Sequence, residues 1–288
     1  MKPIPFKIPK SKEKSLRVQI DQGPYFYDQL HYHPEFQISA IRKGQGILYA
    51  GNGMVQFKAG DVFMIGANVP HLLKNTSIYY SSSSPGVDGV SLFFDFSTFG
   101  NQFFELAETA SLKRLLHQSR RVLKVKTVSL NSIFHQVVDM EHKREEEIII
   151  GFLNILSHLK NAQKSFINSN LYQFPIDESV GNRLNAILEY SFQHLQENIS
   201  IEAISKVAHL SRSQFSRYFK AHTGKTYIEF LNELRVETAC SYLHQNHQTI
   251  EQICYEVGFQ NISNFNRQFK KIKQTTPSAY RSSRVKWK

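Results

Sequence analysis

Two stretches of the chain share the pattern F-x-R-x-F-K, one at 215–220 and the other at 265–270. In each, the two phenylalanines lie one turn apart on one face of a predicted helix, and other side chains lie on the opposite face. Most of these outward residues are of types that bind base edges in the major groove of DNA. The outward positions are Arg212, Ser213, Ser216 and Arg217 in the helix that contains the first stretch, and Ile262, Ser263, Asn266 and Arg267 in the helix that contains the second. Lysines near the helix ends can contact phosphates, which hold the register: Lys220, Lys270 and Lys271.

Each of these helices follows a shorter predicted helix and a tight turn. Residues that can cap a helix stand before all four helices: Ser200, Ser211, Thr249 and Asn261. Gln214 and Gln252 stand three residues after their capping residues, which is the spacing of a capping box. The pattern predicts two helix-turn-helix motifs, at about 200–221 and 249–271. One such helix alone is more often an ordinary core helix, but two copies with matching caps and matching outward faces indicate DNA binding.

The distribution of charge supports the same interpretation. The net charge of +11 is compatible with a solvated surface, with nucleic acid or with an anionic membrane. No acidic residue follows Glu256, whereas the residues after it include Arg267, Lys270, Lys271, Lys273, Arg281, Arg284, Lys286 and Lys288. A basic tail that coincides with the second copy of the repeat favours contact with a polyanion.

Composition excludes several other classes of protein. A length of 288 residues with 41% apolar residues is enough for about two domains, each with a core. The two cysteines, Cys240 and Cys254, exclude a disulfide scaffold and indicate a reducing compartment. The N-terminus lacks the apolar core of a signal peptide, and the longest apolar run, 148–156, is too short to cross a bilayer. We therefore expect a cytoplasmic protein without membrane contact.

The periodicity of the sequence changes along the chain. Residues 16–98 combine short apolar strings with closely spaced glycines, which is typical of antiparallel strands in a sandwich or barrel. Apolar residues recur at a spacing of three to four over 101–119 and over 131–164, which predicts helices. Small polar residues and a proline interrupt this period at 165–179. The expected fold is α+β with two domains: residues 1–165, a linker at 166–179, and an all-α domain at 180–288.

The C-terminal residues resemble the AraC/XylS family of bacterial transcription regulators. The resemblance lies in the string GFQNISNFNRQFKKIKQTTPSAYR at 258–281, with Gly258-Phe259, the second F-x-R-x-F-K pattern, and Pro277-x-x-Tyr280-Arg281. Two residues depart from the family pattern. Cys254 stands where the family usually has alanine, and Gln274 stands where a glycine often ends the recognition helix, which leaves open a differently shaped helix end.

The resemblance implies seven helices in two subdomains, joined by a long helix at about 227–243. The expected apolar contacts of that helix are Ile228, Leu231, Leu234 and Leu243. As a rigid spacer it would place both reading helices on one face of double-stranded DNA, in groove segments about one turn (roughly 34 Å) apart. The resemblance further implies a regulator, which we expect to be an activator that responds to a small-molecule effector and contacts RNA polymerase. The helices within 101–164 are candidates for a homodimer contact.

Two strings of the N-terminal half, at 31–46 and 60–75, resemble the two motifs of the cupin barrel. Metal-binding cupins use two histidines and a glutamate of the first motif and one histidine of the second. The matching positions here are His31, His33 and His71, with Gln37 in place of the glutamate. Three imidazoles can hold zinc or iron, but the missing carboxylate removes a charged ligand, and Glu35, two residues away, is an alternative ligand. We therefore favour a polar pocket over a metal site.

In such a barrel we expect a small molecule to contact His31, His33, Gln37, Tyr49 and His71. Aromatic candidates for the pocket walls are Tyr25, Phe36, Tyr49, Phe57 and Phe63, although an aromatic residue on a strand is more often plain core. The leading hypothesis is a ligand-responsive, sequence-specific DNA-binding regulator without catalytic residues or a cofactor. A metal-dependent cupin enzyme fused to a DNA-binding module is the alternative, and an architectural DNA-coating protein is a third hypothesis.

Overall fold

The computed structural model describes residues 16–100, 102–126, 130–168, 172, 178–245 and 248–282. The chain divides into two compact units, one ending at Gln173 and the other beginning at Phe174. Most of the expected linker at 166–179 lies outside the described residues. Among the described residues, no helix has both the length and the apolar composition that crossing a bilayer requires.

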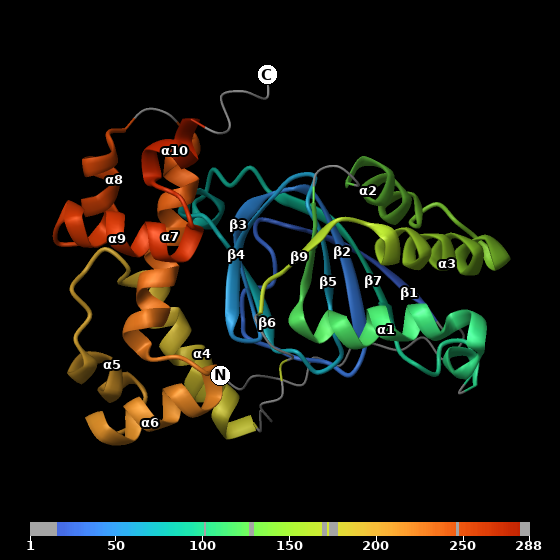
Figure 1. The fold of residues 1–288 in the computed structure, drawn as a ribbon, viewed down its shortest axis with the longest axis horizontal. Coiled ribbons are helices and arrows are strands. Elements are labelled where there is room, and N and C mark those ends of the chain that lie inside the picture. The colour runs from blue at the N-terminus through green and yellow to red at the C-terminus, as the bar shows by residue number, and fades with distance from the viewer. Residues whose placement is uncertain are drawn as a thin grey trace. The chain divides into compact units, whose positions relative to one another are not determined.

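Two antiparallel sheets form the centre of the N-terminal unit (Figure 1). The larger sheet has the strand order β1-β7-β2-β5-β8-β9 and the smaller has the order β4-β3-β6. The strands are β1 (Arg17–Gly23), β2 (Phe36–Lys43), β3 (Gln45–Ala50), β4 (Gly53–Lys58), β5 (Val62–Ile65), β6 (His71–Asn75), β7 (Val87–Phe94), β8 (Leu123–Val125) and β9 (Lys164–Phe166). This β-rich, cupin-like domain confirms the fold class expected for the first half of the chain.

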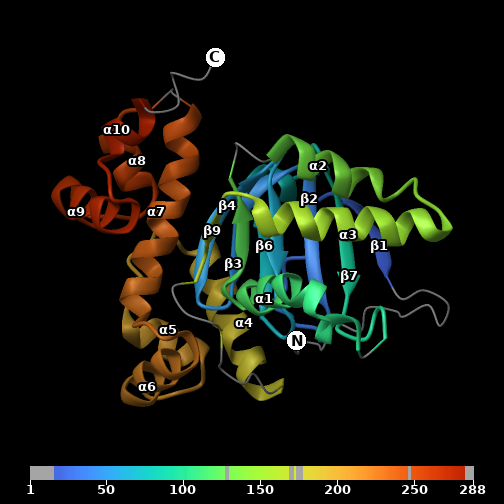
Figure 2. The ribbon, with the colours of Figure 1, turned by 45° about the vertical axis from the view of Figure 1, so that its right-hand side comes forward.

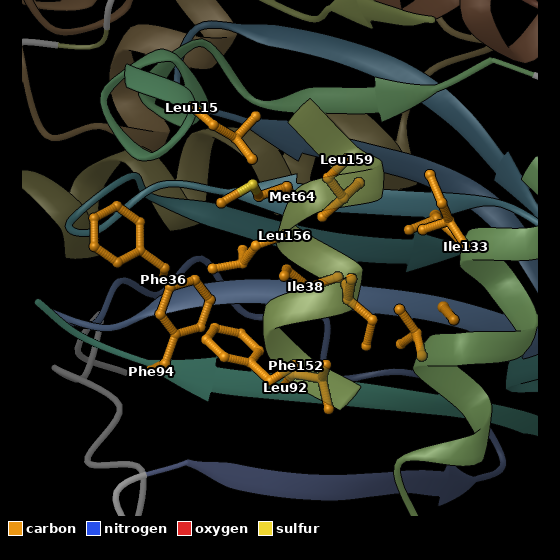
Figure 3. Close-up of a cluster of buried hydrophobic side chains, with 14 of the residues drawn as sticks. Phe36, Ile38, Met64, Leu92, Phe94, Leu115, Ile133, Phe152, Leu156 and Leu159 are labelled. Carbon is orange, nitrogen blue, oxygen red and sulfur yellow. The ribbon is translucent and has the colours of Figure 1, made fainter. Parts of the chain in front are cut away.

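Three helices cover one face of the larger sheet: α1 (Ala110–Gln118), α2 (Leu130–Asp139) and α3 (Glu145–Asn161) (Figures 1 and 2). Alternate residues of the central strands point toward these helices, because successive side chains of a strand lie on opposite faces. Figure 3 shows Phe36 and Ile38 of β2 and Leu92 and Phe94 of β7 in contact with the side chains of α3, such as Phe152. The intervening residues of the same strands therefore point into the space between the two sheets.

Two details of this region differ from the sequence-based expectation. The helix expected at 101–119 begins only at Ala110, after two short 3-10 turns at Phe103–Glu105 and Ala107–Thr109. Strand β8 lies between the two stretches expected to be helical and β9 begins at the end of the second, and together they extend the larger sheet beyond β5. Each has three residues, which is too short for a periodic pattern, and each is fixed by pairing with a distant segment.

The C-terminal unit is helical, and seven helices lie within its described residues, the number that the family resemblance implied. They are α4 (Glu178–Gln193), α5 (Ile201–Val207), α6 (Arg212–Thr223), α7 (Tyr227–Gln245), α8 (Ile250–Glu256), α9 (Ile262–Lys273) and α10 (Pro277–Ser282). Helix α7 is the long helix of this unit, with α5 and α6 near its beginning and α8, α9 and α10 near its end (Figure 2). Three of its expected core contacts are buried, but Ile228 is 49% exposed and the prediction for that residue was wrong.

Candidate nucleic-acid interface and candidate ligand site

Both longer helices of the repeat begin with the caps that the sequence predicts. The Ser211 hydroxyl accepts a hydrogen bond from the backbone N–H of Gln214, whose side chain in turn accepts one from the Ser211 N–H at 3.0 Å. Asn261 caps α9 by accepting from the N–H of Asn264 at 2.8 Å. The shorter helices α5 and α8 are capped in the same way by Ser200 and Thr249. The caps satisfy backbone donors that a helix leaves unpaired in its first turn.

The turn of each motif contains one residue in the left-handed region of backbone conformation. His209 has φ of 52° in the first motif, and Gly258 has φ of 90° in the second. In both motifs a backbone N–H after the turn bonds back into the first helix: Leu210 to Ser205 at 2.9 Å, and Phe259 to Cys254 at 3.1 Å. The two turns are therefore built alike, although only the second uses a glycine.

The inward and outward faces of the two longer helices follow the prediction. Phe215, Phe219, Phe265 and Phe269 are fully buried. Ten of the eleven residues predicted to contact DNA are exposed: Arg212, Ser213, Ser216, Arg217, Lys220, Ser263, Asn266, Arg267, Lys270 and Lys271. The exception is Ile262, which is half-buried and packs against the core of the second motif. Its placement fits a packing residue at the start of α9 better than a base contact.

One residue near this surface was not among the predicted contacts. Glu202 of α5 forms ion pairs with Arg212 and with Lys206, the latter at 3.4 Å. The hydrogen bond from Arg212, followed by that from Lys206, lowers the pKa of the Glu202 carboxyl. In the second motif, Ile262 stands at the position of Arg212, and Arg267, the counterpart of Arg217, donates to the Asn264 side chain at 3.0 Å. The i, i+4 spacing of Glu202 and Lys206 is a sequence signal for the first ion pair, but the contact with Arg212 depends on how α5 and α6 cross.

The ends of α6 and α9 have the same shape. Gly224 follows α6 with φ of 72° and ψ of 2°, and Gln274 follows α9 with φ of 56° and ψ of 21°. Both residues donate their N–H to the carbonyl of the lysine four positions earlier, Lys220 and Lys270, at 2.9 Å. The glutamine therefore adopts the left-handed conformation that glycine usually takes. A differently shaped helix end, which the sequence left open, does not occur.

In the N-terminal unit, the structure brings His31, His33 and His71 together. One ligand nitrogen of each lies within 4.8 Å of the others, and the exposed fractions are 8%, 2% and 1%. His31 and His71 are also joined through their backbones, each N–H donating to the carbonyl of the other. The three residues come from the segment before β2 and from the first residue of β6, which the bridge between these segments holds in register.

The hydrogen bonds of the three rings fix which nitrogen faces the cluster. The Nδ1 atoms of His31, His33 and His71 lie 2.9, 3.0 and 2.8 Å from the carbonyl oxygens of Gln29, Glu35 and Val69. Because a carbonyl only accepts, Nδ1 of His31 and of His71 carries the proton, and their Nε2 is left with a lone pair in the neutral ring. His33 differs, because its Nε2 also faces an acceptor, Oε1 of Gln37. The Nε2 of His71 is buried and has no hydrogen-bond partner.

Burial keeps these imidazoles neutral. Burial, with a smaller contribution from His33, lowers the pKa of His31 to about 4. Burial likewise lowers the pKa of His33, and it lowers the pKa of His71 well below the ordinary value, assisted by the neighbouring His31 and His33. Three neutral rings converge here as a candidate donor set for a metal cation, with Nε2 of His33 also in contact with Oε1 of Gln37.

The side chain of Gln37 lies beside His33 and begins a row of hydrogen bonds. Its Oε1 lies 3.2 Å from Nε2 of His33, and its Nε2 donates to the Ser39 hydroxyl at 2.8 Å. The chain of hydrogen bonds continues from Ser39 to Ser91 at 2.9 Å and from Ser91 to the Asp21 carboxyl at 2.6 Å. Burial raises the pKa of Asp21. This polar row lies on the strand face that points away from α1, α2 and α3.

Glu35 does not take the place of the missing glutamate ligand. Its carboxylate lies 3.7 Å from Nδ1 of His33, the nitrogen that faces the backbone. Among the described residues, the only group of three or more potential metal-ligating His, Cys, Asp or Glu side chains is the histidine cluster itself. Nitrogen ligands of this kind suit zinc, nickel, cobalt, copper or iron(II). The residues present therefore fit a transition metal, with an amide oxygen where a carboxylate would lie.

The structure does not place Tyr49 with the histidines. In the smaller sheet Tyr49 is opposite Met54 and Leu72, whereas Ala50 is opposite His71. Opposed residues share a face and neighbours along a strand do not, so Tyr49 lies on the other face of the sheet from His71.

The other aromatic residues expected to line the pocket do not all lie on one face of the sheets. Phe36 packs with Phe94 beneath the helices, at a ring-centroid distance of 5.3 Å. Tyr25 is 43% exposed. Phe57 and Phe63 are fully buried, and by strand alternation Phe63 lies on the same face of β5 as the polar row. Of the expected pocket residues, the polar set His31, His33, Gln37 and His71 is the part that the structure assembles.

Comparisons with known proteins agree with this architecture. The AraC-like ligand binding domain family matches residues 16–138, and a helix-turn-helix domain family matches residues 204–283. An uncharacterised helix-turn-helix transcriptional regulator of Haemophilus influenzae is 27% identical over 84% of this chain and 85% of its own length. The probable transcriptional regulator LumQ of Photobacterium leiognathi is 26% identical over 93% and 97% of the two chains.

A solved AraC-type regulator from Chromobacterium violaceum is 24% identical, with a TM-score of 0.36 over 39% of this chain and all of that one. The curated relatives are named as regulators and not as enzymes. An AraC-like ligand-binding domain followed by a helix-turn-helix domain, in a chain whose relatives are transcriptional regulators, shows that this protein belongs to the AraC family of DNA-binding transcription regulators.

Proposed function

We propose that α6 and α9 each enter the major groove and together read two successive segments of a non-palindromic DNA site. The observation that carries this proposal is the correspondence of the two helices. Both are capped alike, both bury two phenylalanines, and both expose an arginine at the equivalent position, Arg217 and Arg267. Base contacts would come from exposed Arg, Ser and Asn side chains, and phosphate contacts from Lys220, Lys270 and Lys271.

Selection from random oligonucleotides with the full chain tests this proposal. We expect an enriched site with two separate blocks of preferred bases. Arg217→Ala should remove preference in one block, and Arg267→Ala should remove it in the other. Enrichment without sequence preference would instead indicate an architectural protein. A loss that is uniform over all sequences would show that the substituted arginine contacts phosphate.

We further propose that the space between the two sheets receives the signal to which the regulator responds, at His31, His33, Gln37 and His71. The support is the burial of these four side chains at one place together with Nε2 of His71, a buried atom without a hydrogen-bond partner. Buried polar atoms in proteins are nearly always paired, so an unpaired one beside other convergent polar groups is a place where a ligand, an ion or a water molecule can bind. The bound effector would stabilise one conformation of the protein more than another, as the action of any effector requires.

A transition metal is the second candidate at this site, because three neutral imidazoles converge there. His31, His33 and His71 would hold the ion through Nε2, with Gln37 beside it. The bound ion would supply an open coordination position for an oxygen or nitrogen atom of a further ligand. In a chain of this family such a metal would serve sensing, and catalysis by a cupin enzyme is not favoured by the regulator relatives.

Metal analysis and thermal unfolding separate these candidates. Full-length protein is purified, stripped, and unfolded with and without Zn²⁺, Co²⁺ or Ni²⁺, because binding to the native state raises its stability. A metal site predicts about one ion per chain that is lost in His33→Ala and His71→Ala. His142→Ala is the matched control, since that side chain is 74% exposed. If none of the metals binds, screening small metabolites by the same assay identifies an organic effector.

The remaining expectations concern partners and location. We propose that the protein is an activator that contacts RNA polymerase in the cytoplasm, and that a homodimer forms through the N-terminal helices. Helix α3 supports the dimer, because Ile149 and Ile150 are 41% and 57% exposed on it. Sedimentation of Ile150→Glu should show a weakened dimer. Ile228→Glu is the control, since Ile228 is 49% exposed on α7.

A further inference from the structure

A buried arginine lies at the middle of the DNA-binding unit. Arg235 of α7 is 8% exposed, and no described acidic side chain forms an ion pair with it. Its Nε donates to the carbonyl of Leu195 at 3.2 Å and its Nη2 donates to the carbonyl of Glu197 at 2.7 Å. A buried cation is costly unless it is paired or hydrogen-bonded. The structural role of Arg235 therefore lies in its hydrogen bonds to these two carbonyls.

Both carbonyls belong to the first half of the unit. Leu195 and Glu197 lie in the connection that leads from the end of α4 to α5. Both carbonyls lie beyond Gln193, the last residue of α4, and that of Glu197 also accepts from the N–H of Ile199 at 3.0 Å. The planar guanidinium presents several N–H groups in a fixed fork, so one side chain can satisfy two carbonyls at a defined angle. Arg235 thus holds the α4–α5 connection against α7.

The turn of the second motif contacts the same place. A Cβ atom on Gly258 would lie 2.3 Å from the Leu195 carbonyl oxygen and 2.9 Å from Nε of Arg235. The guanidinium carbon of Arg235 also lies over the ring of Phe259, 5.8 Å from its centroid. Backbone that leads into the first motif, a side chain of the shared helix and the turn of the second motif therefore meet at one point.

Elsewhere each half of the unit is attached to its own part of α7. The Tyr227 hydroxyl, at the first residue of α7, bonds to Ser191 of α4 at 2.9 Å. Lys273, at the end of α9, forms an ion pair with Glu237 of α7 at 2.5 Å. The first contact fixes α4 to α7 and the second fixes α9 to α7, but neither links the two halves of the unit to each other. The contact at Arg235 does.

We propose that Arg235 is a positioning residue that fixes the two recognition helices relative to each other and thereby sets the spacing between the two DNA segments that the protein accepts. Without it, α7 still connects the motifs, but the α4–α5 connection can move away from Gly258. Each motif then reads its own segment while the distance between segments becomes less strictly selected. Arg235 itself is buried and does not touch DNA.

The test uses the full chain and two readouts. Nitroxide labels on Ala221→Cys, at the end of α6, and Ala279→Cys, on α10, report the distance between the motifs by electron spin resonance. Both positions are exposed, and the native Cys240 and Cys254 are buried, so labelling is selective. We expect a narrow distance distribution in the parent protein and a broader one in Arg235→Met. Arg235→Lys should also be broadened, because one ammonium cannot bond both carbonyls at the same angles.

The second readout is binding to DNA in which the spacing of the two segments is changed. Inserting about five base pairs, half a helical turn, should weaken binding by the parent protein about tenfold or more, because one motif loses its bases. In Arg235→Met and Arg235→Lys, the loss of affinity that the insertion causes should be at least about threefold smaller than in the parent protein. Arg183→Met is the matched control, because Arg183 of α4 lies over Tyr218 within the first half. It should change neither readout.

Unchanged distance distributions and an unchanged spacing penalty in both Arg235 variants would overturn the proposal. If Arg235→Met does not fold, as judged by circular dichroism, Arg235→Lys decides alone. The label distances are measured without DNA, so their outcome does not depend on which residues contact the bases.

Discussion

Replacing Gln274 with glycine should stabilise the protein. Gln274 follows α9 in the left-handed region, with φ of 56°. Its counterpart after α6 is Gly224, with φ of 72°. The same helix end is therefore built once with glycine and once with a residue that has a Cβ atom. The two sites form a natural pair in which the cost of the left-handed conformation can be measured in both directions.

Two opposing contributions set the size of the change in the free energy of unfolding. The left-handed conformation costs an L-residue about 1–2 kcal/mol. Glycine avoids this cost, but it loses more backbone entropy on folding, about 0.5–1 kcal/mol. The side chain of Gln274 also donates to the Lys271 carbonyl at 2.8 Å, but it is exposed and water can replace that bond. Gln274→Gly should therefore raise the free energy of unfolding by about 0.5–1 kcal/mol, or the melting temperature by about 2–4 °C.

Differential scanning calorimetry of the full chain measures this change. Gln274→Ala is the first control, because it removes the same hydrogen bond but keeps the conformational cost, so it should bring no gain. Gly224→Ala is the second, and it should destabilise by about 1 kcal/mol or more, because an L-residue is forced into the left-handed region. DNA preference should be unchanged in Gln274→Gly. Equal stability of Gln274→Gly and Gln274→Ala would refute a left-handed residue at the end of α9.

Three further predictions concern the DNA-binding unit. Arg267→Ala should lose about 1–3 kcal/mol of binding free energy at the selected site and relax preference at one or two base pairs. Lys270→Ala should weaken binding to all sites alike and reduce the slope of log K against log salt by about 0.9. Salt titrations on specific and scrambled DNA distinguish the two variants. Phe219→Ala removes a fully buried ring and should cost about 3–5 kcal/mol in denaturant unfolding; a cost below about 1 kcal/mol would contradict its place in the core. Thr249→Ala removes the hydroxyl that accepts from Gln252 at 3.1 Å and should cost about 1 kcal/mol, whereas Thr249→Ser should restore stability.

The amino-acid sequence by itself determined the helix-turn-helix repeat. Caps, turns and the i, i+4 phenylalanine pairs are local features, since a helix satisfies its hydrogen bonds within a few residues of the chain. For that reason the starts of α6 and α9, the left-handed turn at Gly258 and the burial of Phe215 and Phe265 all follow the predictions. The glycine spacing and short apolar strings likewise indicated the strands of the first half.

Only the tertiary structure decided which distant residues meet. Strands β8 and β9 are too short to have a pattern of their own, and they form because β8 pairs with the edge of β5 and β9 pairs with β8. Strand register separates Tyr49 from His71, and a change of one residue in that register would reverse the result. The contact of Arg235 with Leu195 and Gly258 joins three elements that are far apart in the chain. Such contacts depend on packing between elements, and the chemistry of a single segment carries no signal for them.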